Sequence, residues 1–130
     1  MAKKLLRVNL DTSFSLLGIS CHLKDFRFAW TINKYLQLDF KKSKPYTKEK
    51  NQEFSHYAQE LDLETIYLFA NKSQNGFIVT KMKQVDYWML FKNTLDERAK
   101  QHYLTKIRDI DSVLAVFEEE NKKIKEYFVF

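Results

Sequence analysis

Three short apolar runs bounded by polar residues constrain the fold of this chain more than any other feature: Ile66 to Ala70, Tyr87 to Phe91 and Val113 to Phe117. Runs of this length fit strands buried in a sheet, whereas a helix that crosses a membrane needs about 20 apolar residues. The 130 residues are enough to bury one hydrophobic core, and the lone Cys21 cannot form a disulfide within the chain. We therefore expect a single domain over residues 1–130 that is built around a sheet.

The strands of this sheet are predicted from alternating segments and from short aromatic segments. Alternation of leucine and valine with polar residues predicts a strand over residues 4–10. The segment from Tyr87 to Lys92 is apolar on both faces, so we expect it in the centre of the sheet. The segment from Phe14 to Leu23 fits either a helix or a strand, because Gly18 interrupts an otherwise apolar run. Further strands are predicted at Phe54 to Ala58, Thr65 to Ala70, Phe77 to Val79 and Val113 to Phe117, with a turn at Asn71 to Gly76.

Two helices are predicted from polar capping residues followed by apolar residues at helical spacing. Asp25 can cap a helix from Phe26 to Leu36, and Thr94 with Glu97 forms a capping box for a second helix. The first helix is apolar along two edges, so it should pack between other elements. The sequence thus predicts an α+β fold, a mostly antiparallel sheet with helices packed on one face. The apolar helix positions are Phe26, Ala29, Trp30, Phe28, Ile32 and Tyr35 in the first helix and Leu95, Ala99, Tyr103 and Ile107 in the second.

Lysines gather in two stretches of a chain that carries 22 Lys and Arg against 17 Asp and Glu. Residues 41–50 hold five lysines and the only proline, and we expect a mobile, basic loop there. Lysines can neutralise phosphates, and Tyr46 in this stretch can stack on an unpaired base, although a lysine-rich loop is more often simply solvated. The candidate polyanion-binding residues are Lys41, Lys42, Lys44, Tyr46, Lys48, Lys50, Lys122, Lys123 and Lys125, and Lys81 and Lys83 share a face if their stretch is extended.

Residues that could carry catalysis or bind a metal are few and scattered. Cys21 adjoins His22, but neighbouring side chains diverge in a helix and in a strand, so we expect a buried structural cysteine. His22, His56 and His102 stand singly, without the spacing of a zinc site. We therefore expect no enzyme activity, no metal and no cofactor.

Asp86 and Arg27 stand out because each charge lies within aromatic sequence, where an unpaired charge is costly. We expect Asp86 to form a structural ion pair with a basic side chain, either Arg27 or Lys24, that fixes a helix on the sheet. A structural role is favoured over a functional one, since such pairs are common.

Leu16 to Asn33, Asn71 to Gly76 and Lys83 to Tyr87 resemble the IPExxxVDY family, small Bacteroidota proteins, and the resemblance covers nearly the whole chain. The family carries no assigned substrate, cofactor or active site, so the resemblance implies no function. A lysine at the place of the motif's glutamate indicates no catalytic role for that position. Val85, Asp86 and Tyr87 match the second half of the motif, whereas Val79, Thr80 and Lys81 stand in the place of Ile-Pro-Glu.

The leading functional hypothesis is a non-enzymatic interaction or adaptor module that binds a protein partner, because aromatic residues are the usual anchors of an interface. The alternative is an RNA- or ribosome-associated protein that uses the lysine-rich stretches. No long apolar segment follows the first basic residues, and a lone cysteine suits a reducing compartment. We therefore expect a cytoplasmic protein that does not enter a membrane, and its oligomeric state stays open.

Overall fold

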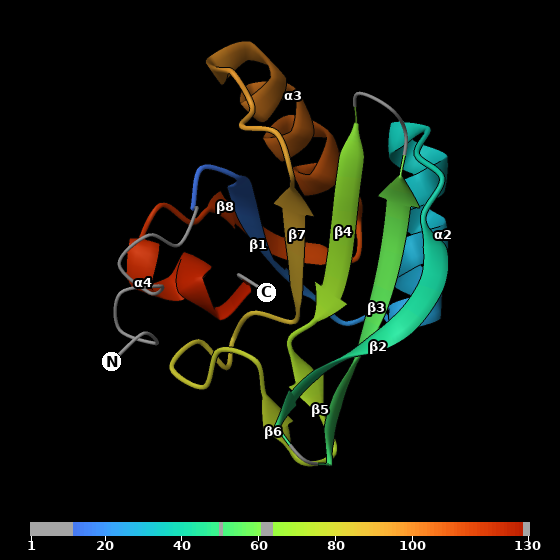
Figure 1. The fold of residues 1–130 in the computed structure, drawn as a ribbon. Coiled ribbons are helices and arrows are strands. Elements are labelled where there is room, and N and C mark those ends of the chain that lie inside the picture. Colours follow the sequence, from blue (N-terminus) through green and yellow to red (C-terminus); the bar gives the residue numbers. More distant parts are fainter. Residues whose placement is uncertain (1–11, 50, 61–63, 129–130) are drawn as a thin grey trace.

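The computed structural model describes residues 12–49, 51–60 and 64–128, and it has the predicted α+β fold. A six-stranded sheet has the order β2-β3-β4-β7-β1-β8, and all of its neighbouring strands are antiparallel (Figure 1). The strand predicted over residues 4–10 lies outside the described residues. Of the described helices, none is long and apolar enough to cross a lipid bilayer. The strands are β1 (Ser15–Cys21), β2 (Lys41–Glu49), β3 (Gln52–Glu60), β4 (Thr65–Ala70), β5 (Lys72–Ser73), β6 (Gly76–Phe77), β7 (Tyr87–Phe91) and β8 (Val113–Glu118), and the helices are α2 (Asp25–Leu36), α3 (Glu97–Arg108), α4 (Lys122–Lys125) and the 3-10 turn η1 (Glu126–Phe128).

The sheet separates two apolar clusters, and its strand β7 contributes to both. Tyr87, Met89 and Phe91 belong to the cluster under α2 and α3, whereas Trp88 and Leu90 belong to the cluster under α4 and η1. Every residue of β7 is buried, as predicted for a central strand that is apolar on both faces. Figure 1 shows α2 and α3 on the far side of the sheet and α4 on the near side. The two long helices therefore cover one face, and the short C-terminal elements cover part of the other.

The segment that fits either a helix or a strand is strand β1, which lies between β7 and β8. Gly18 in its centre lies against two aromatic rings. A Cβ atom at this position would stand 2.5 Å from Cζ of Phe117 and 3.0 Å from Cζ3 of Trp88. These two rings meet edge to face across β1, with centroids 6.1 Å apart. Gly18 therefore allows large side chains from both neighbouring strands to approach the backbone of β1.

The prediction of a mobile loop at residues 41–50 was wrong, because Lys41–Glu49 form the edge strand β2. Lysines are common on edge strands, where one side of the backbone has no neighbour and the side chains reach solvent. Pro45 lies where the pairing with β3 shifts register between Ser43 and Tyr46. Its missing N–H therefore falls at an irregular point of the ladder, where proline is tolerated.

Both long helices begin at residues other than those predicted. α2 starts at Asp25 itself, whose carboxylate accepts a hydrogen bond from the next backbone N–H at 2.8 Å. α3 is capped by Asp96, which accepts from the N–H three residues later at 2.8 Å, so the capping box at Thr94 was wrong. Asp and Thr are both good caps, and the sequence alone does not choose between them. The predicted apolar face of α3 is confirmed by the burial of Tyr103 and Ile107.

One edge of α2 is exposed, so the prediction that this helix packs on both sides was wrong. Phe28, Ala29 and Ile32 are buried against the sheet. Phe26 and Trp30 are instead 64% and 63% exposed. Helical spacing identifies both apolar edges, but the placement of neighbouring elements decides which edge is covered.

Phe128 in η1 docks on the second face of the sheet. Phe128 is 2% exposed, and its ring centroid lies 5.4 Å from that of Phe69 and 5.7 Å from that of Trp88. Residues 129 and 130 lie outside the described part of the chain. Burial of this aromatic ring explains why a short helix can close part of the second face.

One buried polar side chain organises the segment between β6 and β7. Asn71 is fully buried, and its amide uses all of its hydrogen-bonding positions. Nδ2 donates to the carbonyls of Met82 and Val85 at 3.0 and 2.8 Å. Oδ1 accepts from the N–H of Val79 at 3.0 Å and from Nε1 of Trp88 at 2.9 Å. The segment has neither helix nor strand, so these bonds satisfy backbone groups that would otherwise be buried without partners.

Replacing Asn71 by alanine should lower the free energy of unfolding by about 3 kcal/mol or more, because four partner groups lose their hydrogen bonds together. Urea denaturation followed by tryptophan fluorescence measures this change. The matched control is Gln84→Ala, which removes an exposed amide from the same segment and should cost less than about 0.5 kcal/mol. Equal losses in the two variants would contradict the role assigned to Asn71.

Candidate binding surfaces

Two of the predicted polyanion-binding lysines are tied to backbone carbonyls. Nζ of Lys48 donates to the carbonyl of Ile78 at 2.9 Å and to that of Phe77 at 3.3 Å. Nζ of Lys125 donates to the carbonyl of Phe14 at 2.7 Å and also reaches that of Thr12 at 3.3 Å. Both ammonium groups therefore stabilise the fold, because they link segments that are distant in the sequence.

Tyr46 is half-buried and does not present its ring as a stacking platform. Its hydroxyl donates to the carbonyl of Tyr127 at 2.8 Å, and its ring meets Phe69 edge-on with centroids 5.5 Å apart. Burial raises the pKa of Tyr46 above its ordinary value. The residue predicted to stack on a base thus connects the edge strand β2 to η1.

The remaining predicted lysines lie at the surface. Lys41 forms an ion pair with Asp39, with Nζ and the carboxylate oxygen 3.7 Å apart and both side chains exposed. Such a pair in solvent contributes little to stability. Position 50 lies outside the described residues. The exposed members of the predicted set are Lys41, Lys42 and Lys44 on β2 and Lys122 and Lys123 on α4.

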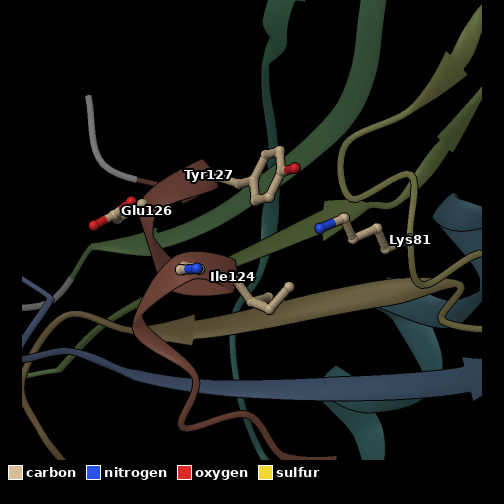
Figure 2. Close-up of a pocket in the computed structure, with 5 residues that line it drawn as sticks. Lys81, Ile124, Glu126 and Tyr127 are labelled. Atoms are coloured by element: carbon tan, nitrogen blue, oxygen red, sulfur yellow. The ribbon is translucent and has the colours of Figure 1, made fainter.

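A cavity of about 400 Å³ lies beside α4 and brings one predicted lysine together with a lysine from the segment before β7 (Figure 2). Lys123 and Lys81 line it together with Ile124, Glu126 and Tyr127. The end of β2 lies close by, since Nζ of Lys48 stands 5.2 Å from the ring centroid of Tyr127. The two lysine stretches, which are separate in the sequence, therefore approach each other at this place. The sequence shows that Lys81 belongs to a basic stretch, but it does not show that this lysine lies opposite α4.

The exposed edge of α2 forms a second candidate surface, which we call the α2 aromatic face: Phe26, Arg27, Trp30, Lys34 and Tyr35. All five side chains are exposed. Nζ of Lys34 lies 5.2 Å from the ring centroid of Trp30, so a cation lies beside the indole. The face combines aromatic area with two positive charges.

The predicted ion pair between Asp86 and Arg27 is not formed. Oδ2 of Asp86 accepts a hydrogen bond from the backbone N–H of Cys21 at 2.7 Å, and Arg27 is exposed on α2. Within the described part of the chain, no basic side chain lies within ion-pair distance of Asp86. A carboxylate that accepts a backbone N–H needs no cation to offset its burial, which is why the expected partner was wrong.

The neighbouring Tyr87 has a structural role as well. Its hydroxyl donates to the carbonyl of Leu23, and its ring stacks on Phe28 with centroids 4.5 Å apart. Burial, with a smaller contribution from nearby Asp25, raises the pKa of this phenol far above its ordinary value, so the hydroxyl stays a donor. Tyr87 therefore attaches the start of α2 to the sheet, and Asp86 holds the end of β1 that precedes it.

A shallow cleft of about 550 Å³ at the end of β1 collects polar side chains, among them His22, Lys72 and Asp86. Cys21 forms part of its wall, but it is 3% exposed, and its Sγ lies 3.6 Å from Oγ of Ser112. Within residues 12–49, 51–60 and 64–128, no group of three His, Cys, Asp or Glu side chains is placed to hold a metal ion. The cleft therefore supplies no argument for a catalytic or metal site.

The environment of His56 on β3 lowers the pKa of its imidazole. Its ring stacks on Phe69 at 4.6 Å, and Nδ1 donates to the carbonyl of Lys44 at 3.2 Å. Nε2 is buried and has no hydrogen-bond partner in the described chain, so a proton there would be unsatisfied. Burial lowers the pKa of His56 and outweighs the carbonyl of Lys44 and the charge of Glu60, which both raise it.

Removing the carboxylate of Asp86 should cost about 2 kcal/mol of unfolding free energy, because the buried N–H of Cys21 loses a charged acceptor. The variants are Asp86→Ala and Arg27→Ala, compared by urea denaturation. Arg27→Ala should cost less than about 0.5 kcal/mol, since this side chain is exposed. Similar losses in the two single variants, together with a loss in the double variant that is smaller than their sum, would instead support an ion pair between Asp86 and Arg27.

The stability of the protein should fall as the pH drops through about 6.5, the ordinary pKa of histidine. Because the pKa of His56 is lower in the folded chain, the unfolded chain takes up the proton first, and acid therefore favours unfolding. The difference in unfolding free energy between pH 7.5 and pH 5 should shrink in His56→Phe, which keeps the aromatic stack. The control is the exposed His102→Gln, and an unchanged pH dependence in His56→Phe would contradict the assignment.

No family model matches the chain, and no curated protein matches it. The resemblance to the IPExxxVDY family therefore stays a prediction.

Proposed function

We propose that this chain is a non-enzymatic binding module that docks a protein partner through its α2 aromatic face. The observation that carries the proposal is the concentration of exposed large apolar side chains on one helix, where Phe26 and Trp30 share a side. Of the four large hydrophobic residues that are exposed in the described chain, Phe26, Trp30 and Tyr35 lie on α2 and only Leu114 lies elsewhere. An exposed aromatic cluster is costly to keep in water and is typical of interaction sites.

The arrangement fits a helix that inserts into a groove of its partner. Phe26 and Trp30 are four residues apart and therefore lie one above the other on α2. Two anchors at this spacing are the usual way in which a helix fills an apolar groove, and Trp, Tyr and Arg are the residues that contribute most to such interfaces. Arg27 and Lys34 flank the aromatic rings, so the groove should carry carboxylates at its rim.

The packing of α2 also favours binding. Its opposite side buries Phe28 and Ile32 completely, which fixes the helix on the sheet before a partner arrives. A rigid helix loses little conformational entropy on binding, and a larger part of the contact energy then appears as affinity. We place this module in the cytoplasm, where a thiol such as that of Cys21 stays reduced.

The double variant Phe26→Ser/Trp30→Ser should abolish partner binding while leaving the fold intact, because both side chains are exposed. Tagged full-length chain is used to capture proteins from a nuclease-treated lysate of its source cells, and mass spectrometry quantifies them. The matched control is Leu114→Ser, since Leu114 is 63% exposed, like Trp30. The proposal expects a protein that wild type and the control retain and that the double variant loses.

A protein retained equally by all three forms would contradict docking on this face. Light scattering of the purified chain tests whether a second copy of the chain covers this face instead of a different protein. A dimer that dissociates in Phe26→Ser/Trp30→Ser but not in Leu114→Ser would mean that a second copy of the chain covers the face. Urea denaturation of each variant confirms that the chain still folds.

A further inference from the structure

We propose that the cavity beside α4 binds single-stranded nucleic acid, with a phosphate between Lys81 and Lys123 and one base or sugar against Ile124 and Tyr127. The proposal does not rest on the function proposed above. Ile124 belongs to the apolar cluster on one face of the sheet, whereas α2 packs on the cluster of the other face. The two surfaces can therefore be tested separately.

The cavity is positively charged. Lys81 and Lys123 are both exposed, and the ion pairs of the described chain involve other lysines, Lys41 and Lys100. In Figure 2 the ammonium group of Lys81 points across the cavity toward α4, whereas the carboxylate of Glu126 points away from it. The one acidic residue of the lining therefore does not neutralise the lysines, which leaves two ammonium groups for an anion.

The wall opposite Lys81 is apolar and fixed in place. Ile124 is 9% exposed and anchors α4 in the core. The carbonyl of Tyr127 accepts a hydrogen bond from the hydroxyl of Tyr46. The ring centroid of Tyr127 lies 5.2 Å from the ammonium of Lys48, which itself donates to two backbone carbonyls. The backbone of Tyr127 is therefore fixed before any ligand arrives, so that contact with a ligand costs little further ordering there.

An apolar wall beside two cations suits a nucleotide better than a simple anion. A base or a ribose fills apolar space while its phosphate meets the lysines, and a volume of about 400 Å³ is within the range of small-ligand sites. Stacked bases of a duplex cannot enter a cavity, whereas the bases of a single strand can turn outward and contact a tyrosine ring. Lys83 and Lys122, both exposed, flank the two cavity lysines in the sequence and can contact neighbouring phosphates.

The test measures binding of a fluorescein-labelled oligouridylate of about 12 nucleotides by anisotropy, at several salt concentrations. Lys81→Gln/Lys123→Gln should weaken binding at least about tenfold and reduce the magnitude of the slope of log K against log salt by about 0.7, since the contact with one phosphate is lost. The matched control, Lys42→Gln/Lys44→Gln, removes the same charge from β2 and should change affinity less than about threefold. Tyr127→Leu should weaken binding without changing the salt slope, and Tyr127→Phe should retain it, because the ring makes the contact.

Equal losses in the two lysine variants would overturn the site, because the binding would then follow total charge alone. Competition by a polyglutamate peptide as strong as that by unlabelled oligouridylate would also overturn it, in favour of an acidic protein ligand. A hairpin duplex that binds as well as the single strand would overturn it too. The same measurement is repeated with oligodeoxythymidylate, a DNA. Binding of either oligonucleotide supports the proposal, and the ratio of the two affinities shows whether RNA or DNA is preferred.

Discussion

The buried amide of Asn71 is the interaction on which the rest of the structure depends. Its four side-chain hydrogen bonds fix the irregular segment before β7, and its backbone N–H donates to the carbonyl of Asp86 at 2.9 Å. Asp86 in turn holds the end of β1, and Tyr87 holds the start of α2. The same network therefore positions Lys81 on one face of the sheet and the α2 aromatic face on the other. Such a network is rigid only when every member is satisfied, so both surfaces depend on one side chain.

The parts of the fold that could be predicted are those where side-chain period and burial agree. β7 is apolar at every position, and only a central strand buries both of its faces. The face of α3 follows from residues spaced by four. β2 could not be predicted, because an edge strand leaves many of its side chains in solvent and its lysines and proline resemble those of a loop. The exposure of Phe26 and Trp30 could not be predicted either, since it depends on which elements surround α2.

The candidate surfaces were predictable in composition but not in arrangement. The sequence identifies the lysine-rich stretches, yet Lys48 and Lys125 use their ammonium groups to bind carbonyls of distant segments. Lys81 lies opposite α4 only because the segment before β7 folds around Asn71. Asp86 was the right residue with the wrong partner, because a backbone N–H from another strand has no signature in the sequence. In each case the missing information is a contact between residues far apart in the chain.

The irregular pairing of β2 also determines how other molecules can approach the sheet. β2 pairs irregularly at Pro45 and again between Thr47 and Glu49, and β8, the other outer strand of the described sheet, skips Leu114 in its pairing with β1. Bulges, proline and lysines on outer strands hinder a further strand from adding to the ladder, and so limit aggregation through the edges. A sheet protected in this way does not grow sideways. In the functions proposed above, a protein or a nucleic acid therefore binds at the elements that cover the two faces of the sheet, α2 and α4.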